Sequence, residues 1–332
     1  MTGLAIGVDI GGTRIRAALV DPSGAVVKHH AEPTPSGLGH HKVMYAVLRG
    51  IHLMMAEAEE LGREVRGIGI GSAGQINPAS GVVEFAVDTL PDWQGKPIRS
   101  IVRERYADLP IWVDNDVNAI ALAEKMYGAG RRYEHFVCLA LGTGVGGAIV
   151  ESGRLVRGCF GGAGEFGHLS VNFEGPRCSC GNYGCLELYA SGTGMARLAR
   201  ESLQGLGLLD REKAERYDSH ELLRDWLAGE PAASRVMSQV IQALATGLAG
   251  IIHIFNPQAV IIGGGVADAG EPLLAAVRAE AGRRTSAKMG DACEILPASI
   301  GGRAGVVGAA ALVWTDGARS GIPNRSGACP GG

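Results

Sequence analysis

The chain has 332 residues, of which 46% are apolar and 20% charged, a composition that excludes a disordered protein and predicts a soluble globular one. The net charge of −3, with no basic stripe, argues against a nucleic-acid partner. The length is too great for one compact core and predicts two domains. We expect a cytoplasmic protein with no membrane partner, because no secretory signal is recognised and no apolar run approaches the roughly 20 residues that cross a bilayer.

Apolar spacing predicts alternating strands and helices in the first part of the chain. Over residues 43–54 the apolar positions recur at i, i+3, i+4 and i+7, which is typical of an amphipathic helix, and Gly62 is suited to end it. The expected strands are 5–10, 15–20, 26–28, 65–74 and 109–116, and a second helix is expected over 97–106.

The second part of the chain repeats this order. A helix is expected over 117–127, ended by Gly128, and a glycine turn again joins two strands. The further elements expected are strands 136–141, 148–152 and 259–266 and helices 234–255, 271–282 and 304–314. Because strand, glycine turn, strand and helix occur twice in that order, we infer a weak internal duplication and an α/β fold with a cleft between two similar lobes.

The first glycine turn, in DIGGTR, is not followed by a helix pattern or by a Lys-Ser/Thr pair, so it is neither a dinucleotide fingerprint nor a Walker loop. Its backbone amides are suited to form an anion-binding nest, and Asp9 beside a phosphate would require a cation such as Mg²⁺. A tight hairpin with a turn aspartate also explains this stretch.

Two further glycine turns strengthen the prediction of a nucleotide site. The turn in LGTGVGG would hold the tail of ATP together with the first turn, and the turn in IIGGGV would leave room for adenine and ribose. The residues expected to bind nucleotide are Asp9, Gly11, Gly12, Thr13, Gly142, Thr143, Gly144, Gly264 and Gly265.

The segment VDNDVN places polar side chains where a strand ends and a helix begins. Asp116 is the candidate general base, which would orient an alcohol for in-line attack on phosphorus, and Asn115 would hydrogen-bond the same substrate. Asp and Asn also suit a helix N-cap, so a purely capping role stays open for Asp114, Asn115 and Asp116.

Three cysteines fall within eight residues, at Cys178, Cys180 and Cys185, and His168 lies ten residues upstream. Three thiolates and one imidazole are a ligand set typical of a structural zinc site with no open position. The alternative is a group of reduced, buried cysteines. The other four cysteines are expected in the core or in the tail, at positions 138, 159, 293 and 329.

Glu165 and Glu187 lie on the segment that such a metal would stiffen, and carboxylates are good acceptors for sugar hydroxyls. His168 could bind the metal through one ring nitrogen and donate to a substrate from the other. A solvated surface position for the two glutamates is the alternative.

Four motifs together resemble those of the ROK family of bacterial sugar kinases and repressors: DIGGT, LGTGVGG, EFGH at 165–168 and CxCGxxGCxE at 178–187. The kinase half of the mammalian UDP-N-acetylglucosamine epimerase/N-acetylmannosamine kinase is similar. The resemblance covers about residues 4–314. It implies the two-lobed actin-like ATPase fold, with lobes 1–116 and 117–302, a helix at 303–316 that returns to the first lobe, and a flexible tail at 317–332.

The resemblance also implies roles for residues at matching positions. Asp116 resembles the catalytic base. The zinc ligands would be His168, Cys178, Cys180 and Cys185, and the sugar-binding residues Gly74, Asn115, Glu165, His168 and Glu187. ATP, Mg²⁺ and structural Zn²⁺ are the cofactors implied, and family members are often dimers or tetramers.

We therefore predict an ATP-dependent hexose kinase that phosphorylates the 6-hydroxyl of glucose or a related hexose. An N-acetylmannosamine or N-acetylglucosamine kinase is the alternative, although Gln75 and Val87 replace an Arg and a Thr of the N-acetylmannosamine kinase and remove polar groups beside the sugar. A non-catalytic sugar sensor is a third hypothesis. A DNA-binding repressor is not expected, because only residues 1–3 precede the first strand, whereas family repressors carry an N-terminal helix-turn-helix.

Overall fold

The computed structural model describes residues 3–86, 90–205, 207 and 215–315. The chain divides into two compact units, the first built from Met1–Arg132, Gly153–Ala163 and Ser299–Gly332 and the second from Tyr133–Ser152 and Gly164–Ala298. The sequence predicted a boundary between the two lobes at residue 116. The first unit instead continues to Arg132 and so includes the helix that begins at Asp116. The tail expected at 317–332 lies outside the described residues.

The first unit holds a five-stranded sheet of order β3-β2-β1-β4-β7 and a separate β5-β6 hairpin. Strand β1 pairs antiparallel with β2 and parallel with β4. The elements are β1 (Leu4–Ile10), β2 (Arg14–Val20), β3 (Val26–Pro33), η1 (Ser36–Leu38), α1 (His40–Glu60), β4 (Val65–Ser72), β5 (Gln75–Asn77), β6 (Val82–Phe85), α2 (Ile98–Arg103), β7 (Ile111–Asn115), α3 (Asp116–Tyr127), η2 (Ala129–Arg132), β10 (Arg154–Val156), η5 (Gly301–Arg303) and α11 (Ala304–Thr315).

Side chains of β1 alternate between large and small, and this decides what covers each face of the sheet. Ile6 and Val8 lie in the core that contains the buried residues of α1. Ala5 points the other way, into a cluster with α11. Because strand side chains alternate, Gly7 and Asp9 share the face of Ala5 and lie under α11.

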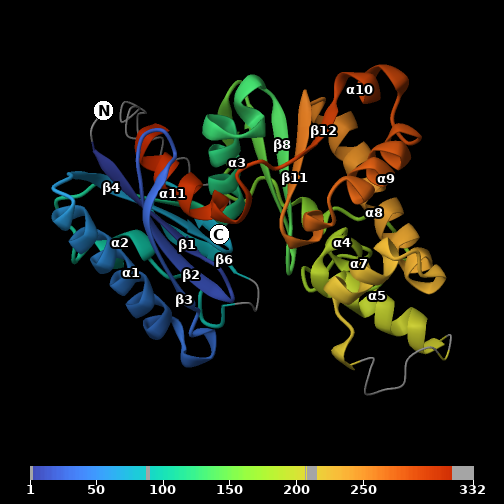
Figure 1. The fold of residues 1–332 in the computed structure, drawn as a ribbon, viewed down its shortest axis with the longest axis horizontal. Helices are drawn as coiled ribbons and strands as arrows, with labels where there is room; N and C mark the ends of the chain where they lie inside the picture. Colours follow the sequence, from blue (N-terminus) through green and yellow to red (C-terminus); the bar gives the residue numbers. More distant parts are fainter. Residues whose placement is uncertain (1–2, 87–89, 206, 208–214, 316–332) are drawn as a thin grey trace. The chain divides into compact units, whose positions relative to one another are not determined.

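Helix α11 lies directly on the backbone of the sheet, as its position against β1 and β4 in Figure 1 shows. A Cβ atom on Gly7 or Gly69 would overlap a backbone carbonyl of α11, and a Cβ on Gly308 would overlap the carbonyl of Ala119 in α3. These three contacts require glycine because the two backbones leave no room for a side chain. They account for part of the high glycine content.

The second unit repeats the sheet topology of the first. Its sheet has five strands in the order β10-β9-β8-β11-β12, with β8 antiparallel to β9 and parallel to β11, as in β3-β2-β1-β4-β7. The internal duplication inferred from the sequence is thus confirmed. The elements are β8 (Phe136–Leu141), β9 (Val145–Glu151), η3 (Phe166–His168), α4 (Glu187–Ala190), α5 (Gly192–Gly205), α7 (Ser219–Leu227), α8 (Pro231–Phe255), β11 (Ala259–Gly263), η4 (Gly265–Ala269), α9 (Glu271–Gly282), α10 (Ala287–Ala292) and β12 (Glu294–Pro297).

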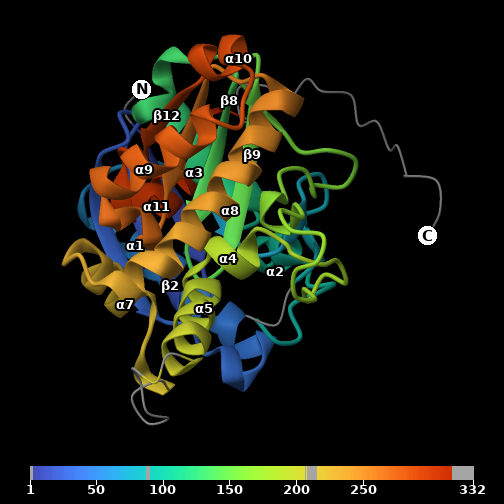
Figure 2. The ribbon, with the colours of Figure 1, turned by 90° about the vertical axis from the view of Figure 1, so that its right-hand side faces the viewer.

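Helix α8 corrects one expectation from the sequence. It has 25 residues and is long and apolar enough, by length and composition, to cross a membrane. Half of that apolar window is buried within the protein, and Figure 2 shows α8 running beside α9 and the α5–α7 region. The apolar length of α8 therefore serves packing in the second unit, as it does in the core helix of a soluble protein.

Replacing Gly308 by alanine should lower the free energy of unfolding by about 2 kcal/mol or more, because the new methyl group would push α11 away from α3. Gly282→Ala is the matched control, since a Cβ on this helical glycine meets no atom. Urea unfolding should show the control equal to or slightly more stable than the wild type. Equal stability of the two variants would contradict the backbone contact.

Candidate functional site

The first glycine turn is the tip of the β1–β2 hairpin. The Gly11 amide donates to the carbonyl of Arg14 at 3.0 Å, which closes the turn. Thr34, directly after β3, holds the turn from outside: its hydroxyl donates to the Gly11 carbonyl at 2.6 Å, and its amide donates to the Thr13 carbonyl at 3.0 Å. Gly12 lies between these fixed points, so the tip has a defined backbone conformation.

Asp9 lies just before this turn on the face of the sheet that α11 covers. Its carboxylate accepts a hydrogen bond from Arg16 Nη1 at 3.0 Å, and its side chain is 15% exposed. Burial raises the pKa of Asp9, and the charge of Arg16 opposes that rise. A Cβ on Gly305, at the start of α11, would come within 2.7 Å of the Asp9 carboxyl carbon. The helix start and the carboxylate are therefore in close contact.

The junction of β7 and α3 brings together two of the predicted substrate residues. Asn115 is the N-cap of α3, and its Oδ1 accepts from the amides of Val117 at 2.9 Å and Asn118 at 3.1 Å. The Nδ2 of Asn115 donates to the carbonyl of Gly74 at 3.0 Å. Gly74 has a φ of +98°, which only glycine adopts easily. The capping role left open for this segment belongs to Asn115.

Asp114 and Arg157 form an ion pair that the sequence did not reveal. The Asp114 side chain is almost fully buried and accepts from Arg157 Nε at 2.7 Å and from Asn118 Nδ2 at 2.8 Å. Asp116, in the first turn of α3, is partly exposed, and its Oδ1 accepts from the Val117 amide at 2.9 Å. Asp114 thus fixes the junction, while Asp116 is the more accessible carboxylate.

The second glycine turn is the tip of the β8–β9 hairpin and is closed by a hydrogen bond from the Gly142 amide to the Gly144 carbonyl at 2.9 Å. One oxygen of Glu187, Oε2, accepts from the amide of Val145 at 2.9 Å. A Cβ on Gly144 would lie 2.5 Å from that same oxygen. Glu187, predicted as a sugar ligand, therefore also braces the second turn.

The start of α5 holds the same turn from another side. The Thr193 hydroxyl donates to the Thr143 carbonyl at 2.7 Å, and the Gly192 amide donates to the Gly142 carbonyl at 2.8 Å. Ser191 is fully buried, and its hydroxyl accepts from an amide in the first turn of α5, as a helix N-cap does. None of these contacts was predicted from the sequence.

The third glycine turn follows β11. Gly264 has a φ of +90°, and a Cβ on it would overlap the carbonyl of Leu141. Gly265 opens the short helix η4. Since Leu141 directly precedes Gly142, the second and third turns are neighbours in the second unit, as their predicted common role requires.

The predicted metal ligands converge. Ligand atoms of His168, Cys178, Cys180 and Cys185 all lie within 4.8 Å of one another. The sulfurs of Cys180 and Cys185 are 3.6 Å apart, and the Cys178 sulfur is 3.7 Å from Nδ1 of His168. Sulfurs bonded at about 2.3 Å to one tetrahedral ion lie about 3.8 Å apart. The cluster therefore fits a zinc-sized ion with little rearrangement.

Protonation within the cluster is uneven. Burial opposes ionisation of Cys178, but hydrogen bonds, first from the Cys180 amide and then from neighbouring side chains, lower the pKa of Cys178 to about 7. Burial and the adjacent thiols raise the pKa of Cys185. The other ring nitrogen of His168, Nε2, lies 3.9 Å from Glu165 Oε2, so the imidazole stands between the cluster and a predicted sugar-binding carboxylate.

The remaining cysteines only partly match the expectation of core or tail positions. Cys138 is buried in β8, and Cys293 is half-buried after α10. Cys159 is exposed and disulfide-bonded, so for this residue the expectation was wrong. Cys329 lies outside the described residues, as does Val87.

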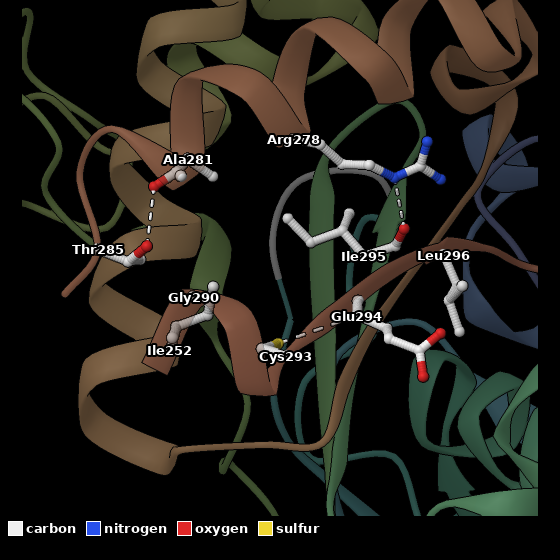
Figure 3. Close-up of a pocket in the computed structure, with 10 residues that line it drawn as sticks. Ile252, Arg278, Ala281, Thr285, Gly290, Cys293, Glu294, Ile295 and Leu296 are labelled. Carbon is white, nitrogen blue, oxygen red and sulfur yellow. Dashed lines mark hydrogen bonds between the residues drawn. The ribbon is translucent and has the colours of Figure 1, made fainter. Parts of the chain in front are cut away.

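A separate cavity of about 420 Å³ in the second unit is lined by residues of α8, α9, α10 and β12 (Figure 3). Arg278 Nε donates to the carbonyl of Ile295 at 2.8 Å, and Glu294 accepts from the hydroxyl of Tyr133 at 2.8 Å. Burial raises the pKa of Cys293 to about 11, so its thiol is neutral near pH 7. Arg278 and Glu294 thus bond to other groups of the protein, and the cavity lining shares no residue with the predicted site.

Comparison with known proteins connects this geometry to one family. The model of the ROK family matches residues 5–316. A glucokinase of Thermotoga maritima is 36% identical over 312 residues, which cover 93% of this chain and 96% of that enzyme. A xylose repressor of Caldicellulosiruptor bescii is 31% identical, with 95% of this chain and 79% of the repressor covered.

Among solved structures, the ROK family glucokinase from Streptomyces griseus in complex with glucose and AMPPNP is 35% identical, with a TM-score of 0.79, and the match covers 93% of this chain and 99% of that one. The chain thus has the two-domain actin-like ATPase fold of these sugar kinases. It belongs to the ROK family.

Proposed function

We propose that this protein is an ATP-dependent hexose kinase that transfers a phosphoryl group to the 6-hydroxyl of glucose or a related hexose. The observation that carries the proposal is the hydrogen bond between Asn115 and Gly74, which fixes the end of β7 and leaves Asp116 accessible at the start of α3. The glucokinases of Thermotoga maritima and Streptomyces griseus support this substrate class.

In this mechanism Asp116 accepts the proton of the sugar hydroxyl. Its place in the first turn of α3 favours the ionised carboxylate, because a helix N-terminus stabilises negative charge. Phosphoryl transfer has a loose transition state, so alignment of the hydroxyl and the phosphorus contributes more than base strength. The residues proposed to bind the sugar are Gly74, Asn115, Glu165, His168 and Glu187.

The nucleotide would be held by the three glycine turns. Backbone amides of the first two turns would face phosphate oxygens, and Gly264 and Gly265 would leave space for adenine and ribose. Mg²⁺ bound with the nucleotide would neutralise phosphate charge, and Asp9 would be the carboxylate that holds it. Arg16 forms an ion pair with that carboxylate.

We also propose that the Cys₃His cluster binds a structural zinc ion that fixes the segment carrying Glu165 and Glu187. We place the enzyme in the cytoplasm, as a dimer or tetramer. A second candidate function is that of a sugar-responsive regulator without catalysis, which the 31% identity to a xylose repressor supports.

Asp116→Asn should lower kcat by about 10² or more while glucose affinity stays unchanged, because the amide cannot accept the hydroxyl proton. ADP release and glucose titration by calorimetry measure the two quantities. Asp108→Asn, at an exposed aspartate outside the site, is the control and should keep the wild-type kcat. Near-normal turnover of the Asp116 variant would remove this residue from its proposed role.

A substrate panel separates the kinase from the regulator. Wild-type protein should release ADP with glucose at a higher kcat/KM than with N-acetylglucosamine or N-acetylmannosamine, since Gln75 stands where the N-acetylmannosamine kinase has an Arg. Sugar binding by calorimetry without ADP release from any of the three would favour the regulator. A preference for N-acetylmannosamine would overturn the assignment to glucose but leave the kinase mechanism intact.

Cys180→Ser should reduce bound zinc, measured by elemental analysis, and should weaken glucose binding at the same time, because metal binding and local folding are coupled. Cys293→Ser is the matched control: its thiol lies outside the cluster, and both quantities should match the wild type. Full zinc content in the Cys180 variant would contradict the proposed ligand set.

A further inference from the structure

The first and second glycine turns lie in different units, but each is held by a hydrogen bond from a threonine hydroxyl to a carbonyl of the turn. In the first, the hydroxyl of Thr34 donates to the carbonyl of Gly11 at 2.6 Å. In the second, the hydroxyl of Thr193 donates to the carbonyl of Thr143 at 2.7 Å. The donor and acceptor are 23 residues apart in the first case and 50 in the second, so neither contact is part of the turn itself.

Each of these hydrogen bonds also sets the direction of an amide. In a trans peptide the C=O group and the N–H group of the next residue point to opposite sides. Holding the Gly11 carbonyl toward Thr34 therefore turns the Gly12 N–H away from it. Holding the Thr143 carbonyl toward Thr193 does the same for the Gly144 N–H. The amides so directed are those that an anion-binding nest presents.

The backbones that carry the two hydroxyls are themselves fixed. The amide of Thr34 donates to the carbonyl of Thr13 at 3.0 Å, which anchors this threonine to the turn it holds. Thr193 lies in the first turn of α5, and its hydroxyl is 3.1 Å from the hydroxyl of Ser191. Ser191 is fully buried and also donates to the carbonyl of Glu187 at 2.6 Å. Hydrogen bonds thus hold the backbone segment that carries each threonine.

We propose that Thr34 and Thr193 are positioning residues for the nucleotide: each fixes one glycine turn so that an amide, Gly12 N–H or Gly144 N–H, faces a phosphate of ATP. This inference rests on the proposed kinase function. The threonines act through the turns and need not touch the nucleotide. Their contribution is preorganisation, since a turn that is already in its binding conformation loses less entropy when the anion binds.

The test compares Thr34→Val and Thr193→Val with Thr34→Ser and Thr193→Ser. Valine keeps the shape of threonine without the hydroxyl, and serine keeps the hydroxyl. Each valine variant should weaken ATP affinity about 5-fold, because ATP must then order the backbone of about one turn residue when it binds. The double valine variant should lose about 25-fold, because the two contacts share no partner. The serine variants should stay near the wild type.

ATP affinity is measured by calorimetric titration, which needs no turnover, and KM for ATP and for glucose by ADP release. The proposal expects KM for glucose within about two-fold of the wild type in every variant, and a thermal midpoint that falls in the valine variants by no more than one lost hydrogen bond explains. Unchanged ATP affinity in both valine variants would overturn it. So would a joint rise of both KM values by the same factor, which indicates a general structural role. Failure of the kinase proposal is separate, since it would appear as absent ADP release from the wild-type protein.

Discussion

Direct contact between the backbone of α11 and the sheet of the first unit determines where the first part of the site lies. The contact exists because Gly7 and Gly69 have no side chains, and α11 can therefore approach closely enough to place Gly305 against the Asp9 carboxylate. Each glycine costs about 0.5–1 kcal/mol relative to alanine in chain entropy. The close packing of the helix on the sheet offsets that cost, and the arrangement keeps Asp9 shielded and next to Arg16.

Much of this fold could be predicted from the sequence, because the patterns are local. The run of β-branched and small apolar residues in AIGVDI predicted β1, the 3.6-residue period predicted α1, and the repeated glycine hairpins predicted the duplication that the sheet orders confirm. Boundaries were less accurate: β3 extends to Pro33, and α2 ends at Arg103. Helices α5 and α7 were missed, although α7 begins with a capping box of Asp218 and Glu221 that is visible in the sequence.

The sequence identified which residues belong to the candidate site, but it did not identify the hydrogen bonds and ion pairs that these residues make. Spacing identified the cysteine cluster, since four ligands close in sequence are readily close in space. It could not identify the partner of Asp114, because Arg157 comes from a segment that reaches the first unit only after the chain has formed β8 and β9. It also could not show that Glu187 bonds the Val145 amide, a contact over 42 residues. Long-range hydrogen bonds of this kind depend on the folded backbone and leave no local pattern.

The duplication explains where the glycine turns lie, but their conformations are set by parts that differ between the units. In the first unit the stabilising contact comes from Thr34, directly after β3, whereas in the second it comes from residues 187–193, which begin two residues after the last cysteine of the cluster. Cys185, Glu187 and Thr193 thus lie on one short stretch of chain. In the proposed kinase this stretch carries a metal ligand, a sugar ligand and a residue that holds the second glycine turn. Disorder at the metal would therefore be transmitted to the phosphate turn as well as to the sugar, because Glu187 contacts the turn and the next helix begins at Gly192.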